Sequence, residues 1–71
     1  MKVGTLVIPE TRFLKSGYFT LYTNAKQSGR FHIGEIGIVI GVNADKRDHM
    51  VRIYTSGGAI GNIPVGNLEK I

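Results

Sequence analysis

The chain has 71 residues, of which 42% are hydrophobic and 20% charged, with a formal net charge of +4. This length allows one domain, residues 1–71, and the composition excludes a disordered protein. The absence of cysteine excludes disulfides and thiolate metal sites and agrees with a reducing compartment. The positive charge favours anionic partners.

The first apolar run predicts a strand over residues 3–8, with Val3 and the Leu6-Val7-Ile8 run available to a core. Pro9 ends this strand because proline cannot donate to a strand ladder. The run is too short for a signal peptide or a membrane span. We therefore expect a cytoplasmic protein with no membrane partner.

Residues 9–30 form a long connection that is rich in aromatic residues. Residues 18–23, with the sequence YFTLYT, predict one arm of a hairpin. Residues 24–29 predict the polar turn that leads back to Phe31. The sequence leaves the conformation of the whole connection open.

The segment 35–42 has the clearest strand pattern in the chain. Apolar β-branched residues recur at every second position, namely Ile36, Ile38, Ile40 and Val42. This stripe predicts that the four side chains point together into the core. Gly37 and Gly41 on the opposite side predict a sharply bent strand.

Turn signals divide the remaining chain. Residues 43–48 predict a polar loop, and residues 50–55 a second strand with half-buried character. The Ser-Gly-Gly sequence at 56–58 predicts a tight turn into an antiparallel strand over 59–63. Pro64 ends that strand. Residues 65–67 then suit one helical turn, and residues 68–71 a short closing strand.

Two motifs carry a resemblance to SH3 domains. Residues 31–35, FHIGE, resemble the F-x-x-G-D/E diverging turn of that family, and residues 61–68, GNIPVGNL, resemble its G-x-I-P-x-x-x-V/L ending. The resemblance runs from residue 31 to the last residue. It implies an all-β fold, a single five-stranded SH3-like barrel with a long first loop and a 3-10 turn before the last strand.

The SH3 resemblance also implies binding of proline-rich peptides, a mode that requires an aromatic groove. The corresponding positions here hold Asn62, Gly66, Asn67, His49 and Met50, and the chain lacks tryptophan. Residues 34–42 are similar to a strand of KOW-type barrels, which implies a role in the transcription or translation machinery. Stand-alone barrels of this length are also common in phages and mobile elements, which implies a phage-like origin.

The chain ending, PVGNLEKI, resembles the P-V-x-x-L-E-R-I ending of type II dihydrofolate reductases, which implies a tetramer around a central pore. That family lines its pore with a V-Q-I-Y segment. The matching residues here are Ile60, Gly61, Asn62 and Ile63, without the glutamine and the tyrosine.

Basic residues interleaved with aromatic residues suit nucleic acid, because cations neutralise phosphates and rings stack on bases. The alternative is that the aromatic rings fill the core and the charges lie at its rim. The candidate residues for binding nucleic acid or a partner are Arg12, Lys15, Tyr18, Tyr22, Lys26, Arg30, Arg52 and Tyr54. His32 and His49 have no metal-ligand or catalytic partners nearby in the sequence.

These patterns predict a small binding module with no catalytic site, no cofactor and no metal. Its expected partner is nucleic acid or a nucleoprotein complex, and the alternative is a role as a protein–protein adaptor or assembly component. A third alternative, implied by the chain ending, is a tetramer like the type II dihydrofolate reductases, although the pore residues are missing. Exposed Tyr18, Phe19 and Tyr22 ringed by basic residues would favour the first role. Buried rings with an uncovered edge strand would favour the second. The oligomeric state stays open.

Overall fold

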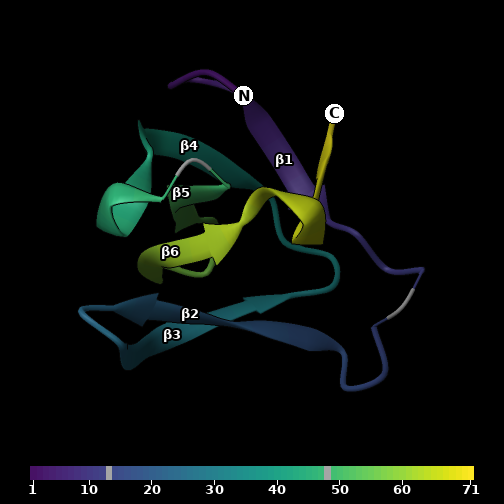
Figure 1. Ribbon diagram of the computed structural model, residues 1–71. Coiled ribbons are helices and arrows are strands. Elements are labelled where there is room, and N and C mark those ends of the chain that lie inside the picture. Colours follow the sequence, from purple (N-terminus) through teal and green to yellow (C-terminus); the bar gives the residue numbers. More distant parts are fainter. Residues whose placement is uncertain (13, 48) are drawn as a thin grey trace.

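The computed structural model describes residues 1–12, 14–47 and 49–71, and this part of the chain is built mainly of β-strands (Figure 1). The strands and the two short 3-10 helices are, in chain order, β1 (Leu6–Pro9), β2 (Tyr18–Thr23), β3 (Lys26–His32), β4 (Gly37–Val42), η1 (Ala44–Lys46), β5 (Met50–Thr55), β6 (Ile60–Pro64), η2 (Val65–Asn67) and β7 (Leu68–Lys70). The expected all-β class is confirmed. Position 48, the end of the expected polar loop, lies outside the described residues.

The seven strands of the described residues form one antiparallel sheet with the order β3-β2-β6-β5-β4-β1-β7, and the sheet curls into a half-barrel. The expectation of five strands is therefore wrong. The two additional strands are the β2–β3 hairpin, which the sequence placed within a long first loop. The hairpin joins the sheet where Tyr22 of β2 pairs with Asn62 of β6.

The turn of this hairpin is shorter than the six residues expected. Asn24 and Ala25 both have positive φ, 51° and 64°, which is the geometry of a two-residue hairpin turn. The chain therefore re-enters the sheet at Lys26, and most of the expected turn belongs to β3. β3 lies at one edge of the sheet, and most of its side chains are polar and exposed. Polar side chains on an edge strand disfavour pairing with a strand of another molecule, and so they disfavour aggregation.

The inward face of β4 is the reverse of the one expected. Gly37 and Val39 are buried, whereas the four β-branched residues expected in the core are exposed: Ile36 46%, Ile38 38%, Ile40 39% and Val42 45%. The inner side of β4 is crowded, since a methyl group added to Gly37 would lie 3.2–3.3 Å from Phe31, Ile53 and Val7. The core thus accepts glycine there, and the isoleucines face outward.

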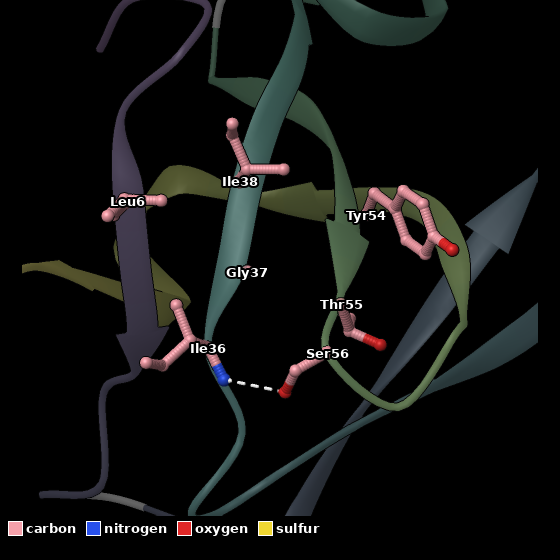
Figure 2. Close-up of a pocket in the computed structure, with 7 residues that line it drawn as sticks. All are labelled: Leu6, Ile36, Gly37, Ile38, Tyr54, Thr55 and Ser56. Carbon is pink, nitrogen blue, oxygen red and sulfur yellow. Dashed lines mark hydrogen bonds between the residues drawn. The ribbon is translucent and has the colours of Figure 1, made fainter.

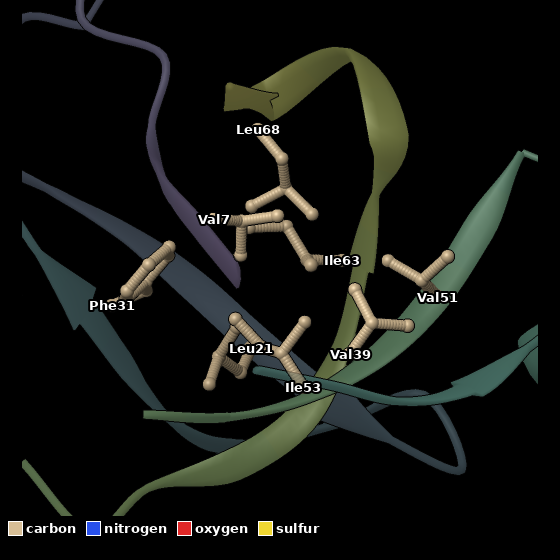
Figure 3. Packing of buried hydrophobic residues seen from close by; sticks show 8 residues of the cluster. All are labelled: Val7, Leu21, Phe31, Val39, Val51, Ile53, Ile63 and Leu68. Atoms are coloured by element: carbon tan, nitrogen blue, oxygen red, sulfur yellow. The ribbon is translucent and has the colours of Figure 1, made fainter. Parts of the chain in front are cut away.

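The core consists of side chains from each of the seven strands described (Figure 3). Its buried members are Val7, Leu21, Phe31, Val39, Val51, Ile53, Ile63 and Leu68. Among the described residues, Phe31 is the largest fully buried side chain. Of the apolar residues expected from the first strand, Val7 lies in the core, but Leu6 and Val3 are exposed.

The second half of the chain otherwise follows the expected order. β5 pairs antiparallel with β6 through the turn after Thr55, where Gly58 has a φ of 91°. The 3-10 helix η2 follows Pro64, as expected, and leads into β7. β7 pairs with β1, so the two ends of the chain lie close together (Figure 1).

Candidate interaction surfaces

A row of exposed apolar side chains crosses four neighbouring strands on the outside of the sheet. Leu6 of β1 pairs with Ile38 of β4, Ile38 pairs with Tyr54 of β5, and Tyr54 pairs with Ile60 of β6. Paired residues point to the same side of a sheet with Cβ atoms about 5 Å apart, so the row is continuous. Leu6 is 48% exposed, Tyr54 50% and Ile60 44%.

Ile36, just before β4, and Ile40 of β4 flank Ile38 and widen this row. We call the six residues together the apolar face: Leu6, Ile36, Ile38, Ile40, Tyr54 and Ile60. The pairing of β4 with β5 shifts register between Val39 and Gly41, at a bulge that contains Ile40. An extra residue in one strand interrupts the simple alternation of side chains, which is how bulges redirect a side chain.

A hollow of about 380 Å³ lies within the apolar face (Figure 2). Leu6, Ile36 and Ile38 lie on one side of it, and Tyr54 and Ser56 lie on the other. Two hydrogen bonds fix the strands at one end of the hollow: the Ile36 amide donates to Ser56 Oγ at 3.1 Å, and the Ser56 amide donates to the Ile36 carbonyl at 2.7 Å. Ile36, just before β4, and Ser56, just after β5, thus close one end of the hollow, and the paired strands β1, β4 and β5 supply the remaining lining residues.

Arg52 borders this region but is not directed wholly to solvent. Its Nε donates to Asn62 Oδ1 at 3.2 Å, and Asn62 is only 2% exposed. The register places Tyr22, Asn62 and Arg52 in one row across β2, β6 and β5. Arg52 therefore already has a hydrogen-bond partner within the sheet, whereas an arginine that binds phosphate would direct its guanidinium to the ligand.

The β2–β3 hairpin brings together three of the polar and aromatic residues. The Arg30 guanidinium carbon lies 4.3 Å from the centre of the Tyr18 ring, a cation–π contact. The His32 ring lies 5.6 Å from the Tyr18 ring and is tilted by 52°. Tyr18 is half-buried, and Phe19 packs against the core. One of the three aromatic residues of β2 thus belongs to the core rather than to a surface.

Tyr22, which is exposed, borders a second hollow of about 500 Å³ together with Arg47, His49 and Met50. The sequence did not single out Arg47 or His49 for binding. Arg47 follows η1 and His49 precedes β5, so they meet Tyr22 only through the pairing of distant strands. No local pattern could have revealed this.

Arg12 is engaged by an acidic neighbour. Its backbone amide donates to Glu10 Oε1 at 3.0 Å, and its Nε donates to the same oxygen at 3.2 Å. These bonds hold the pKa of Glu10 below its ordinary value, with the backbone hydrogen bond as the larger cause and the side-chain hydrogen bond as the next. The same partner raises the pKa of Arg12.

The expected basic and aromatic site is thus divided over several surfaces. Tyr18 and Arg30 meet on the hairpin, Tyr54 belongs to the apolar face, and Arg52 and Arg12 have partners of their own. Lys15 and Lys26 are exposed. The segment compared with the reductase pore lies in β6, where Gly61, Asn62 and Ile63 are buried.

Within residues 1–12, 14–47 and 49–71, no three histidine or carboxylate side chains are grouped as metal ligands would be. The same residues contain no helix with the length and apolar character needed to cross a membrane. Comparisons with protein-family models, with curated proteins and with solved structures found no match to this chain. What the protein does must therefore be argued from its surfaces.

Proposed function

We propose that the protein is a non-enzymatic assembly module that binds protein through its apolar face. The observation that carries this proposal is the exposed row Leu6–Ile38–Tyr54–Ile60, in which each residue is paired with the next across the sheet. Single exposed apolar residues are ordinary, but a continuous patch on rigid strands marks an interaction site.

The size of the patch supports the proposal. The six residues of the apolar face are between 38% and 50% exposed. With a surface of roughly 200 Å² for each large side chain, they expose on the order of 500 Å², near the upper end of the largest patch on a typical monomer. Burying this area provides a hydrophobic driving force for association.

The tagged chain, used as bait in an extract of its source cell, tests the proposal. We expect wild type to retain protein, either further copies of the chain or another protein, and nuclease treatment to leave this retention unchanged. Ile38→Lys should abolish it because the substitution puts a charge at the centre of the apolar face. Ile33→Lys is the matched control, since Ile33 is 52% exposed and lies outside this face. Equal retention by all three baits would refute the proposal.

We also propose that the half-barrel is an SH3-like fold. The order of elements from β4 to β7 supports this assignment, with a tight β5–β6 turn and a 3-10 helix before the last strand. So does the turn before β4, where the His32 amide donates to Glu35 Oε1 at 2.7 Å and the Glu35 amide donates to the His32 carbonyl at 3.0 Å. An experimental structure whose β4–β7 strands follow another connectivity would overturn it.

A second candidate function, nucleic-acid binding, is favoured by the hairpin cluster of Tyr18, Arg30 and His32. An arginine beside an aromatic ring offers both a positive charge and a stacking surface. If this cluster binds nucleic acid, affinity should fall steeply with added salt and should drop in Arg30→Ala. Affinity that is independent of salt, or unchanged in that variant, would exclude this role for the cluster.

A further inference from the structure

The apolar face carries a projecting ring beside a recess, and this shape suits an identical partner. We propose that the face binds the apolar face of a second copy of this chain and forms a symmetric dimer. This inference rests on the proposed function and names its partner. Tyr54 exposes half of its surface and stands at one side of the 380 Å³ hollow, opposite Leu6 and Ile36 (Figure 2).

The hollow has room for the ring that such a partner would bring. Its volume is about 380 Å³ and it opens broadly to the solvent, so a side chain of a partner can enter it from outside. A two-fold contact uses the same patch on both subunits, so that each Tyr54 would enter the hollow of the other copy. A second copy therefore fills both hollows with residues that this chain already carries.

Charge does not oppose an identical partner. The chain has a net charge of +4, yet none of the six residues of the apolar face is charged. Two copies can approach through this face without placing like charges at the centre of the contact. Arg52 lies two residues before Tyr54 on β5, and its Nε donates a hydrogen bond to Asn62 Oδ1. An uncharged centre that contains an aromatic side chain is typical of interfaces between proteins.

The area sets the expected strength of the dimer. Two faces of on the order of 500 Å² each would bury about 1,000 Å², which is the lower limit for a specific interface. The dimer should therefore dissociate on dilution. We expect a monomer–dimer equilibrium in which the larger species has twice the chain mass of 7.8 kDa.

Sedimentation equilibrium over a wide concentration range tests the proposal with three proteins. Wild type and Ile33→Lys should dimerise alike, whereas Ile38→Lys should have a dissociation constant at least about tenfold higher. Both variants add one positive charge, so the difference between them reports position rather than charge. If circular dichroism shows that Ile38→Lys is unfolded, Tyr54→Ser replaces it, with the same expected loss.

Wild type that stays monomeric at every concentration would overturn the dimer, and so would an Ile38→Lys variant that dimerises as tightly as wild type. Monomeric wild type that cosediments with phospholipid vesicles through this face would also overturn it, in favour of a lipid surface. The proposed function fails separately, when the Ile38→Lys bait retains the same proteins as wild type. A monomeric chain that binds another protein through the apolar face would refute only the dimer.

Discussion

The two faces of β4 are both apolar, but they have opposite roles. The inner face presents Gly37 and Val39 to a crowded core, and the outer face presents Ile38 and Ile40 to solvent. The larger residues are outside because the inner side already lies against Phe31 and Ile53. Side-chain size along a strand therefore does not identify the buried face when the opposite strands fill the core.

The largest expected effect comes from placing a charge on each face in turn. Val39→Asp should lower the free energy of unfolding by about 4 kcal/mol or more, since it buries an unpaired carboxylate in the core. Ile40→Asp, one residue along on the exposed side, should change it by only about 0.5 kcal/mol. Urea unfolding at low protein concentration measures both. Equal losses would mean that the two faces do not differ as described.

A smaller loss is expected where two strands approach closely. A methyl group on Gly61 of β6 would lie 2.7 Å from Leu21 Cβ and 3.2 Å from the Tyr22 amide nitrogen of β2. Gly61→Ala should therefore cost about 1–3 kcal/mol through overpacking and should weaken the attachment of the hairpin. Gly66→Ala is the control, because nothing lies within 4 Å of its added methyl group. Thermal unfolding of the two variants compares them, and equal melting temperatures would contradict the close approach.

The cation–π contact between Arg30 and Tyr18 on the hairpin should contribute less to stability than the close approach at Gly61. Arg30→Ala is expected to lower stability by about 0.5–1 kcal/mol, because the contact with Tyr18 is partly exposed to water. Lys26→Ala, on the same exposed strand, should have a smaller effect. Chemical denaturation gives the values, and hydrogen exchange in β2 and β3 shows whether the loss is local. A Lys26→Ala loss as large as that of Arg30→Ala would argue against the contact.

The smallest expected effect on stability comes from the ion pair between Arg12 and Glu10, which lies outside the sheet. The pKa of Glu10 is lowered in the folded chain, so its contribution to stability is complete above the unfolded pKa, about 4.3, and is lost as the pH falls through the folded pKa. Arg12→Ala should raise the pKa of Glu10 only part of the way, because the backbone amide at position 12 still donates to the carboxylate. An NMR titration of the Glu10 carboxyl carbon checks this. Lys15→Ala should leave that pKa unchanged, and an equal rise in both variants would contradict the assignment.

Local chemistry predicted much of the fold. Glycine at the β5–β6 turn, Pro64 before η2 and the aromatic strand formers of β2 all act over a few residues, and these elements lie where the sequence placed them. The face of β4 depends instead on side chains from three other strands of the sheet, β1, β3 and β5. The alternation of isoleucine with glycine and valine fits either orientation of the strand.

The candidate site was less predictable for the same reason. Tyr18 and Arg30 were both selected from the sequence, and antiparallel pairing of β2 with β3 brings them into contact. The apolar face was missed because its isoleucines were assigned to the core. Arg47 and His49 were missed because only the packed sheet places them beside Tyr22.

The polar strands at the two ends of the sheet limit the ways in which copies can join. β3 carries Lys26 and Arg30, and β7 carries Glu69 and Lys70, so both rims disfavour the addition of a further strand. If copies joined by pairing their edge strands, each added copy would expose a new unpaired edge strand, and the assembly could grow without limit. The proposed contact between two apolar faces would cover the apolar face of both copies, so growth would stop at the dimer. The charged rims therefore favour a particle of fixed size over a fibre.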